Sequence, residues 1–230
     1  MGIFKKFFSR KREEAQVLDA LASSKEIMSN TYAKKRWGGQ QTDFYSGDGS
    51  HSKKLVKPYV REVSQFLGSF EDPLVVCDVG CGDFNVGRQL VPYAKKYIGV
   101  DIVDALIDRN NNEFRQENLE FRCLNISEDA LPDADCILIR QVLQHLSNNE
   151  ISRVVKKIRT YKHVIVTEHL PKGGFSPNLD KPTGAGIRLS KKSGVVLTEP
   201  PFELNPETTK ELLNISYRGG RIVTTYFSFQ

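Results

Sequence analysis

The sequence predicts an α/β fold in which a mostly parallel sheet carries helices on both faces and closes with an antiparallel strand pair. Three observations support this prediction. Short apolar runs alternate with helix-like segments from Leu74 to Thr167, as in parallel sheets covered on both sides. The first run, Leu74–Val79, stops at a turn with two glycines, Gly80 and Gly82. The last stretch, Arg221–Phe229, has the β-branched and aromatic residues of an antiparallel strand.

Composition limits the function classes. The 230 residues and the 39% hydrophobic content fit one globular domain of ordinary size with additions. The net charge of +5 equals that of residues 1–12, which hold five basic residues and no acid, so the rest of the chain is formally neutral. A neutral body argues against nucleic acid as a partner. The four cysteines lack a C-x-x-C spacing, so we expect reduced thiols of a cytosolic protein and no metal site.

Residues 1–30 are expected to form a basic amphipathic N-terminal helix region. Within residues 1–12, four apolar side chains share one helical face; they are Ile3, Phe4, Phe7 and Phe8. Such a segment can bind an anionic membrane surface weakly. A flexible tail, or a helix that docks on the body, is the alternative. The expected location is the cytoplasm, with weak peripheral contact to the inner membrane surface through residues 1–12.

Residues 31–72 are expected to form a lid loop and a helix. Residues 36–50 are rich in glycine, serine, aspartate and aromatic residues, which is typical of a loop, and a lid over a ligand is a plausible use. Tyr45 would then reach the substrate. The alternative is a surface connection anchored by Trp37. The segment Lys57–Phe70 has apolar residues at helical spacing.

Residues 73–230 hold the alternating elements. The expected strands are 74–79, 97–102, 119–124, 136–139, 163–167, 195–197 and 221–229. The expected helices are 85–96, a short helix or loop over 106–115, 141–160 and a short helix over 208–213. The third of these can break at 147–149, where Ser147 and Glu150 have the spacing of a capping box.

The glycine turn departs from the dinucleotide fingerprint G-x-G-x-x-G. Its third position is Asn85, and the acidic Asp78 is unfavourable beside a pyrophosphate. Three features follow one another in the chain: the D-x-G-x-G motif, a second strand that ends in Asp101, and a third strand followed by an acidic loop with a proline. Together they resemble the class I S-adenosylmethionine-dependent methyltransferases. This resemblance covers about Leu74 to Thr167 and the C-terminal strand pair, and makes 73–230 the methyltransferase domain.

The resemblance implies a Rossmann-like sheet, S-adenosylmethionine as cofactor, and a set of cofactor-binding positions. Asp78 and the glycines would form the turn under the methionine part, and Asp101 would accept hydrogen bonds from the ribose. Asn125 stands where many members have an acidic residue, so its role toward adenine differs from that of a carboxylate. The full cofactor set is Asp78, Gly80, Gly82, Asp101, Ile102, Asn125, Ile126, Arg140 and Gln141.

Catalytic and substrate-binding candidates come from the later strands. His145 is the first candidate for a general base, against the alternative of a structural histidine. Glu168 and His169 follow the fifth strand, at the edge where open α/β sheets bind ligands. Arg188 could hold a phosphate or carboxylate of the acceptor through a bidentate contact, although it could equally be a solvated arginine.

The predicted function is O-methylation of a small polar acceptor, sugar-like or phosphorylated. The stretch I-L-I-R-Q-V-L-Q-H-L-S resembles small-molecule methyltransferases of bacterial polysaccharide and secondary-metabolite pathways. R-Q-V-L stands after the fourth strand in place of an N-P-P-Y-type tetrad, which disfavours amino-methylation of nucleic-acid bases as the subfamily with that tetrad performs it. A nicotinamide-dependent Rossmann enzyme and a non-catalytic binding module on the same fold are the two alternatives.

Overall fold

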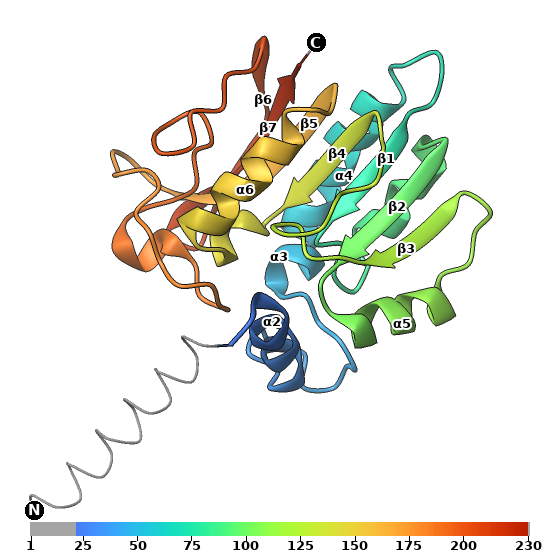
Figure 1. The fold of residues 1–230 in the computed structure, drawn as a ribbon, viewed down its shortest axis with the longest axis horizontal. Coiled ribbons are helices and arrows are strands. Elements are labelled where there is room, and N and C mark those ends of the chain that lie inside the picture. The colour runs from blue at the N-terminus through green and yellow to red at the C-terminus, as the bar shows by residue number, and fades with distance from the viewer. Residues whose placement is uncertain (1–21, 230) are drawn as a thin grey trace, which may run out of the picture.

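A seven-stranded sheet with the order β3-β2-β1-β4-β5-β7-β6 forms the centre of the molecule (Figure 1). The strands are β1 (Val75–Val79), β2 (Lys96–Asp101), β3 (Leu119–Cys123), β4 (Cys136–Arg140), β5 (His163–Pro171), β6 (Thr208–Tyr217) and β7 (Gly220–Ser228). Strands β1 to β5 are parallel, whereas β7 pairs antiparallel with both β5 and β6. The predicted fold class is confirmed.

The structure is a computed structural model, and it describes residues 22–229. The basic amphipathic segment expected over residues 1–12 lies outside the described residues. The helices within the described range are α2 (Ser24–Ala33), α3 (Asp48–His51), α4 (Lys53–Leu67), α5 (Asp104–Glu113) and α6 (Asn148–Ile158). Four short 3-10 turns occupy Gly87–Gln89, Val91–Tyr93, Leu143–His145 and Arg188–Lys191. None of the described helices has the length and apolar character needed to cross a bilayer.

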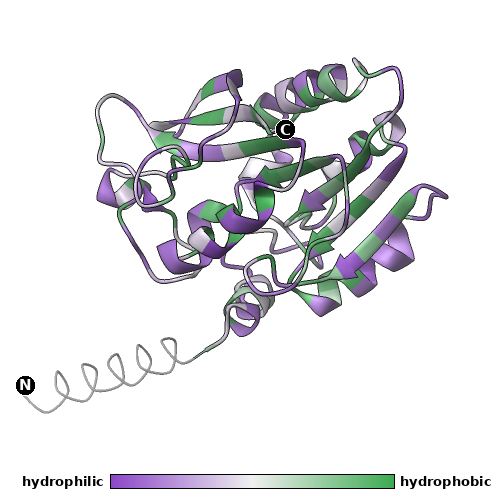
Figure 2. Cartoon of the chain, turned by 45° about the horizontal axis from the view of Figure 1, so that its top comes forward, coloured by the Kyte–Doolittle hydropathy of each residue, from purple (hydrophilic) through white to green (hydrophobic). Residues whose placement is uncertain are grey.

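Two hydrophobic layers, one on each face of the sheet, explain the apolar strand sequences. On one face, Val76 of β1 packs with Val63 of α4 in one buried cluster. On the other face, Cys77 and Val79 pack with residues of α6, including Val154. Side chains alternate across a strand, so a strand buried on both faces needs apolar residues at almost every position. Figure 2 shows the hydrophobic residues concentrated in the central strands.

The helix boundaries follow local sequence signals. Ser147 caps α6: its hydroxyl accepts a hydrogen bond from the Glu150 amide at 3.4 Å, and the Glu150 carboxylate accepts one from the Ser147 amide at 3.0 Å. The predicted break before this helix and its capping box are both confirmed. Helix α4 carries Pro58 and buries one side on the sheet. Its predicted start at residue 57 is four residues late.

Three predicted elements are wrong. The helix expected over 85–96 is replaced by two 3-10 turns, because Pro92 has no amide hydrogen, and Asn118 donates to the carbonyls of Val91 and Ala94 at 3.2 and 3.0 Å. The helix expected over 208–213 is part of β6, which pairs with β7 along its length. The strand expected over 195–197 is a buried loop, apolar because it packs on the α6 face of the sheet.

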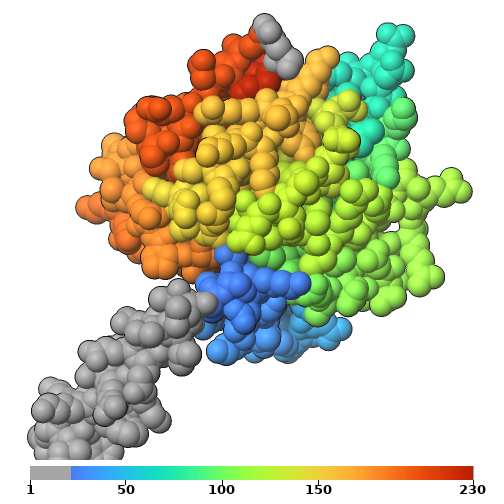
Figure 3. All heavy atoms as spheres, in the orientation of Figure 1, coloured from blue at the N-terminus to red at the C-terminus, as the bar shows by residue number. Residues whose placement is uncertain are grey.

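The N-terminal segment and the loop after β5 cover the carboxyl ends of the parallel strands. Figure 3 shows the N-terminal part of the described chain packed between the residues that follow β5 and those around α5. The contacts include an ion pair between Lys25 and Asp104 at 2.7 Å and a hydrogen bond from the Trp37 indole to the Ala185 carbonyl at 3.2 Å. These segments, far apart in sequence, enclose the site described next.

Candidate active site

A cavity of about 560 Å³ opens at the carboxyl ends of β1, β2 and β4, the edge where open α/β sheets bind ligands. Residues of α2 and α3 form one wall, and the turn after β4 and the loop over 185–189 form another. Ten predicted site residues line it: Gly80, Gly82, Asp101, Ile102, Asn125, Ile126, Arg140, Gln141, His145 and His169. The other four, Asp78, Tyr45, Glu168 and Arg188, lie outside its wall.

The glycine turn requires both of its glycines. Gly80 and Gly82 have φ angles of 71° and 57°, in the region that side chains disfavour. A Cβ atom at Gly80 would lie 2.3 Å from a methyl of Val142, and one at Gly82 would lie 2.3 Å from the hydroxyl of Ser46. The turn is tied to β2, since the Gly80 amide donates to the Val100 carbonyl at 2.7 Å. The backbone therefore reaches the cavity floor without side chains.

Asp101 ends β2 with a buried carboxylate at the cavity wall. One oxygen accepts a hydrogen bond from the Gly82 amide at 3.1 Å, and the other accepts one from the Val103 amide at 3.2 Å. Burial raises the pKa of Asp101 to about 6, so the group is mostly ionised at neutral pH. Each carboxylate oxygen keeps a lone pair for a further donor.

An apolar section of the wall lies beside Asp101. It includes Ile102 after β2 and Ile126 after β3, and Ile126 is 7% exposed. Asn125, which precedes Ile126, also lines the cavity, and its side-chain oxygen accepts hydrogen bonds from the amide and the hydroxyl of Ser127, both at 2.9 Å. This occupied oxygen sets the orientation of the amide and leaves its NH2 group as the available donor.

Asp78 lies beneath the glycine turn and not at the large cavity. It accepts a hydrogen bond from the Tyr97 hydroxyl at 2.9 Å, and burial raises its pKa to about 6. A smaller pocket, with Tyr97 and Arg140 in its wall, contains it. The structure thus places Asp78 where it supports the turn from below.

Arg140, the last residue of β4, and Gln141, the residue after it, both line the cavity. The Arg140 guanidinium donates to the Gly49 carbonyl at 2.5 Å and to the Ser50 hydroxyl at 3.4 Å, and it stacks on the Tyr59 ring at 4.9 Å. It therefore fastens the α3 segment over the strand ends. Gln141 has a φ of 57°, which is an unfavourable backbone conformation for a residue with a side chain. Strained backbone conformations occur preferentially at functional sites.

His145 occupies the last position of the 3-10 turn after β4. Its ring lies 5.0 Å from the Trp37 ring, and its Nδ1 lies 3.2 Å from the Gly184 carbonyl oxygen. A carbonyl only accepts, so Nδ1 carries the hydrogen and Nε2 holds a lone pair. Burial lowers the pKa of His145 to about 4, and the imidazole is neutral at physiological pH. The helical face expected to join Gln141, His145 and Asn148 is wrong, because α6 begins only at Asn148.

Glu168 and Arg188 lie behind this turn and hold it. Glu168 is 4% exposed, accepts a hydrogen bond from the Leu143 amide at 3.2 Å, and has its pKa raised to about 8 by burial. The Arg188 guanidinium is 1% exposed. Its five N–H groups donate to the carbonyls of Leu179, Leu143, Gln144 and Leu146 and to the Asn148 side chain. No Arg188 donor is left for an acceptor molecule.

His169 and Tyr45 take different places. His169 lines the cavity and its Nε2 lies 3.1 Å from the Tyr217 carbonyl oxygen, so Nε2 carries the hydrogen there and Nδ1 the lone pair. The Tyr45 hydroxyl donates to Asp48 at 2.7 Å, and its ring stacks on His51 with centroids 4.3 Å apart. Tyr45 therefore supports α3 and does not reach the cavity.

Several residues at the site were missed by sequence reasoning. Asp83 accepts hydrogen bonds from the Ser46 amide at 2.9 Å and from His51 at 2.5 Å. Ser46 in turn lies 2.9 Å from the Tyr32 hydroxyl, and both sit over Gly82. The available signal was the acid immediately after G-x-G. Other cavity residues without a prior role are Arg36, Gln144, Tyr217 and Arg218.

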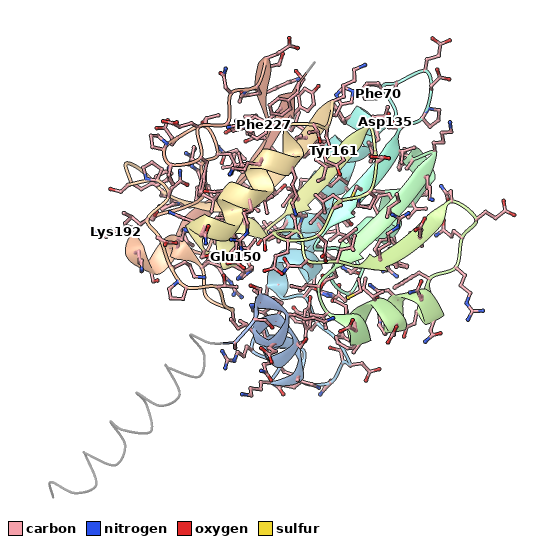
Figure 4. All side chains as sticks on the ribbon, in the orientation of Figure 1. Phe70, Asp135, Glu150, Tyr161, Lys192 and Phe227 are labelled. Atoms are coloured by element: carbon pink, nitrogen blue, oxygen red, sulfur yellow. The ribbon has the colours of Figure 1, made fainter. Side chains whose placement is uncertain are left out.

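Glu150 connects three walls of the cavity mouth. It is 6% exposed at the start of α6, beside the loop after β5 (Figure 4). Its carboxylate accepts hydrogen bonds from the hydroxyls of Ser24 and Thr183, and from the Ser147 hydroxyl at 2.6 Å. The N-terminal segment, α6 and the loop after β5 are thus joined through one side chain.

Residues 77–162 match a family model described as a methyltransferase domain. No curated protein matches the sequence at a significant level. Among solved structures, the N-methyltransferase NodS of Bradyrhizobium japonicum is similar at a TM-score of 0.63 and 13% identity, covering 87% of this chain and 98% of that chain. Magnesium protoporphyrin IX methyltransferase of Synechocystis gives 0.57 and 17%, covering 91% and 99%. The N-terminal domain of EvdMO1 gives 0.54 and 12%, covering 75% and 83%.

The matched domain supports a methyltransferase, and the strand order and the cavity at the strand ends fit the Rossmann-like fold of the solved methyltransferases. The NodS structure holds S-adenosylhomocysteine, and the magnesium protoporphyrin IX methyltransferase structure holds S-adenosylmethionine. The solved structures, all below 25% identity, bear on the fold, so the acceptor has to be argued from the cavity itself.

Proposed function

We propose that the enzyme transfers the methyl group of S-adenosylmethionine to a hydroxyl oxygen of a small polar acceptor, sugar-like or phosphorylated. The observation that carries this proposal is His145, a neutral imidazole at the cavity wall whose Nδ1 hydrogen is held by the Gly184 carbonyl. A hydroxyl must lose its proton as it is methylated, and the Nε2 lone pair supplies a general base for that step.

The residues present fit the cofactor. The ionised Asp101 can accept hydrogen bonds from two ribose hydroxyls, and the bare turn at Gly80 and Gly82 lets the methionine part lie against the backbone. Ile102 and Ile126 offer apolar surface to the flat adenine. The free NH2 group of Asn125 suits a ring nitrogen of adenine, which accepts.

The sulfonium of the bound cofactor supplies an electrophilic methyl group, so the protein mainly has to orient the acceptor and exclude water. Trp37, hydrogen-bonded to Ala185, covers the cavity beside His145. His145 then takes the acceptor proton at Nε2. Because its pKa is about 4, the imidazole is unprotonated throughout the physiological pH range, and the acceptor hydroxyl has to replace the Gln144 amide group that lies 3.4 Å from Nε2.

The charges at the cavity mouth support a polar acceptor. Arg36 and Arg218 both line the cavity, and Arg218 is paired with Asp48. Two guanidinium groups can bind a phosphate or hydroxyl oxygens of an acceptor. The EvdMO1 domain was determined in the presence of S-adenosylhomocysteine and D-fucose, which makes a sugar a reasonable first acceptor class to test here.

The test is transfer of a labelled methyl group from the cofactor to sugars, sugar phosphates and amines, in the wild type and in His145→Ala. NodS is described as an N-methyltransferase, so amine acceptors belong in the panel. We expect an O-methylated sugar or sugar phosphate, and a turnover about 100-fold or more lower in His145→Ala. The affinity for S-adenosylhomocysteine should be unchanged. Turnover of amines alone, or full activity of the variant, would contradict the proposal.

We infer in addition a cytoplasmic enzyme of polysaccharide biosynthesis with weak peripheral membrane contact through residues 1–12. The support is the basic and apolar composition of this segment in an otherwise neutral chain. Deletion of residues 1–12 should abolish sedimentation with anionic liposomes and leave activity on a soluble acceptor intact. A full-length protein that never sediments would refute the membrane contact.

A further inference from the structure

Three residues that line the cavity have a buried side-chain atom without a hydrogen-bond partner within the described residues 22–229, and besides the Nε of Arg140 these are two amide atoms. One is the side-chain nitrogen of Gln141, a donor, and the other is the side-chain oxygen of Gln144, an acceptor. Both residues line the cavity, and Gln144 is 5% exposed. Buried polar groups are nearly always satisfied, so an unmatched donor and an unmatched acceptor on the same turn indicate a ligand that supplies the partners.

The orientation of the Gln144 amide is fixed by its own nitrogen. That nitrogen donates to the Gln141 carbonyl, and it lies 3.4 Å from the Nε2 of His145, which holds a lone pair. Both amide hydrogens therefore have acceptors within the turn, and the oxygen is the atom left for a ligand. The bond to the Gln141 carbonyl, at 3.3 Å, keeps the two glutamines together on one turn.

The backbone of Gln141 also points to a ligand-binding role. Its φ of 57° is unfavourable for any residue except glycine, and yet the position carries a long polar side chain. The amide of Gln141 donates to the Thr167 carbonyl at 2.7 Å, which holds the turn in this conformation. The strained backbone directs the side chain across the cavity toward α3, where it contacts Gly49.

We propose that Gln141 and Gln144 form a subsite for two adjacent hydroxyl groups of the acceptor, one accepting from Gln141 and one donating to Gln144. This inference rests on the proposed function and narrows it to acceptors with a neutral vicinal diol next to the methylated hydroxyl. The pair carries no charge, so it selects hydroxyls and leaves any phosphate to Arg36 and Arg218 at the mouth. The link from Gln144 to His145 places the diol beside the base.

The same two atoms could instead bind the ammonium and carboxylate groups of the cofactor, which also combine a donor with an acceptor. Substitution of the glutamines distinguishes these two ligands, the acceptor and the cofactor. If the pair binds the acceptor, its loss leaves the affinity for S-adenosylhomocysteine unchanged and removes the preference for a diol. If the pair binds the cofactor, the affinity for S-adenosylhomocysteine falls.

The experiment uses the full chain loaded with S-adenosylhomocysteine and two probes, cis-cyclohexane-1,2-diol and cyclohexanol, titrated by NMR. The wild type should bind the diol about tenfold more tightly than the mono-alcohol, as expected for one additional hydrogen bond. Gln144→Leu should lose this preference, and Gln141→Gly should lose it as well, without strain because glycine favours the observed φ. Gln65→Leu, at an exposed position of α4, is the matched control and should keep it.

Each outcome decides the matter. A diol preference that disappears in both variants while binding of S-adenosylhomocysteine persists supports the subsite. Equal binding of the two probes by the wild type, no binding of the diol, or a preference that survives in Gln144→Leu would overturn it. So would a tenfold loss of S-adenosylhomocysteine affinity in Gln144→Leu. Failure of the proposed function would show separately, as absence of O-methylated product from any acceptor.

Discussion

Replacing Glu168 with glutamine should remove a loss of stability that the wild-type protein suffers as the pH rises. Glu168 is buried behind the turn after β4, where it accepts a hydrogen bond from the Leu143 amide. Burial raises its pKa from about 4.5 to about 8. Between these values the folded protein holds a proton that the unfolded chain has released. The stabilising contribution of Glu168 is therefore complete below pH 4.5 and is lost as the pH rises through 8.

The magnitude follows from this difference in protonation. Within the window, one proton difference changes the free energy of unfolding by about 1.4 kcal/mol per pH unit. Glu168→Gln keeps the shape and an oxygen for the Leu143 amide, but it has no proton to lose. From pH 5.5 to 7.5 the variant should thus gain about 3 kcal/mol relative to the wild type.

Urea unfolding followed by circular dichroism at several pH values measures this gain. Glu207→Gln, at an exposed position, is the control. Its free energy of unfolding should depend on pH as that of the wild type does. Parallel curves for Glu168→Gln and the wild type would refute the reasoning. They would mean that the nearby guanidinium of Arg188 keeps Glu168 ionised in the folded protein, despite the carbonyl groups that already surround it.

Two further predictions concern the cofactor end of the cavity. Asp101→Asn should weaken binding of S-adenosylhomocysteine by about tenfold to 100-fold, the loss of charge-assisted hydrogen bonds, and unchanged affinity by calorimetry would remove Asp101 from the site. Gly82→Ala should place a methyl group 2.3 Å from the Ser46 hydroxyl at a φ of 57°, lowering the melting temperature on the order of 5 °C together with cofactor affinity. Gly174→Ala, with no heavy atom within 4 Å, is its control, and equal melting temperatures would contradict the prediction.

The parallel part of the fold could be predicted because its signals are local. Strands β1, β2, β4 and β5 contain apolar runs, β3 alternates apolar and charged residues, and β1 stops at glycines that no helix or strand interior would favour. Strand β6 could not be found in this way. Most of its residues are exposed on one side, and its conformation depends on pairing with β7 through a turn at Arg218 and Gly219, which both have positive φ.

The residues of the candidate site also differ in how well the sequence predicts their positions. Asp101 and the glycines occupy strand ends, so their placement follows once the strands are known. Arg188 shows the opposite case: its sequence neighbourhood suggests an exposed loop, yet the guanidinium is buried under the turn of Leu143 and Gln144. An arginine with every donor occupied cannot be distinguished by sequence from one that faces a ligand.

The acceptor end combines His169 with four segments that are distant in the chain: 24–50, 140–146, 185–189 and 217–218. Buried or paired groups fix their relative positions, with Glu150 joining the N-terminal segment to the loop after β5 and Arg140 fastening α3. At the predicted cofactor end, the Gly82 amide donates to Asp101 of the adjacent strand, and the Asp83 amide donates to the Ser46 hydroxyl of the first segment at 2.8 Å. Under the proposed function, we therefore expect substitutions in 185–189 and 217–218 to change the choice of acceptor while the contacts around Asp101 and Gly82 remain, because these two segments have no hydrogen bond to either residue among the described residues.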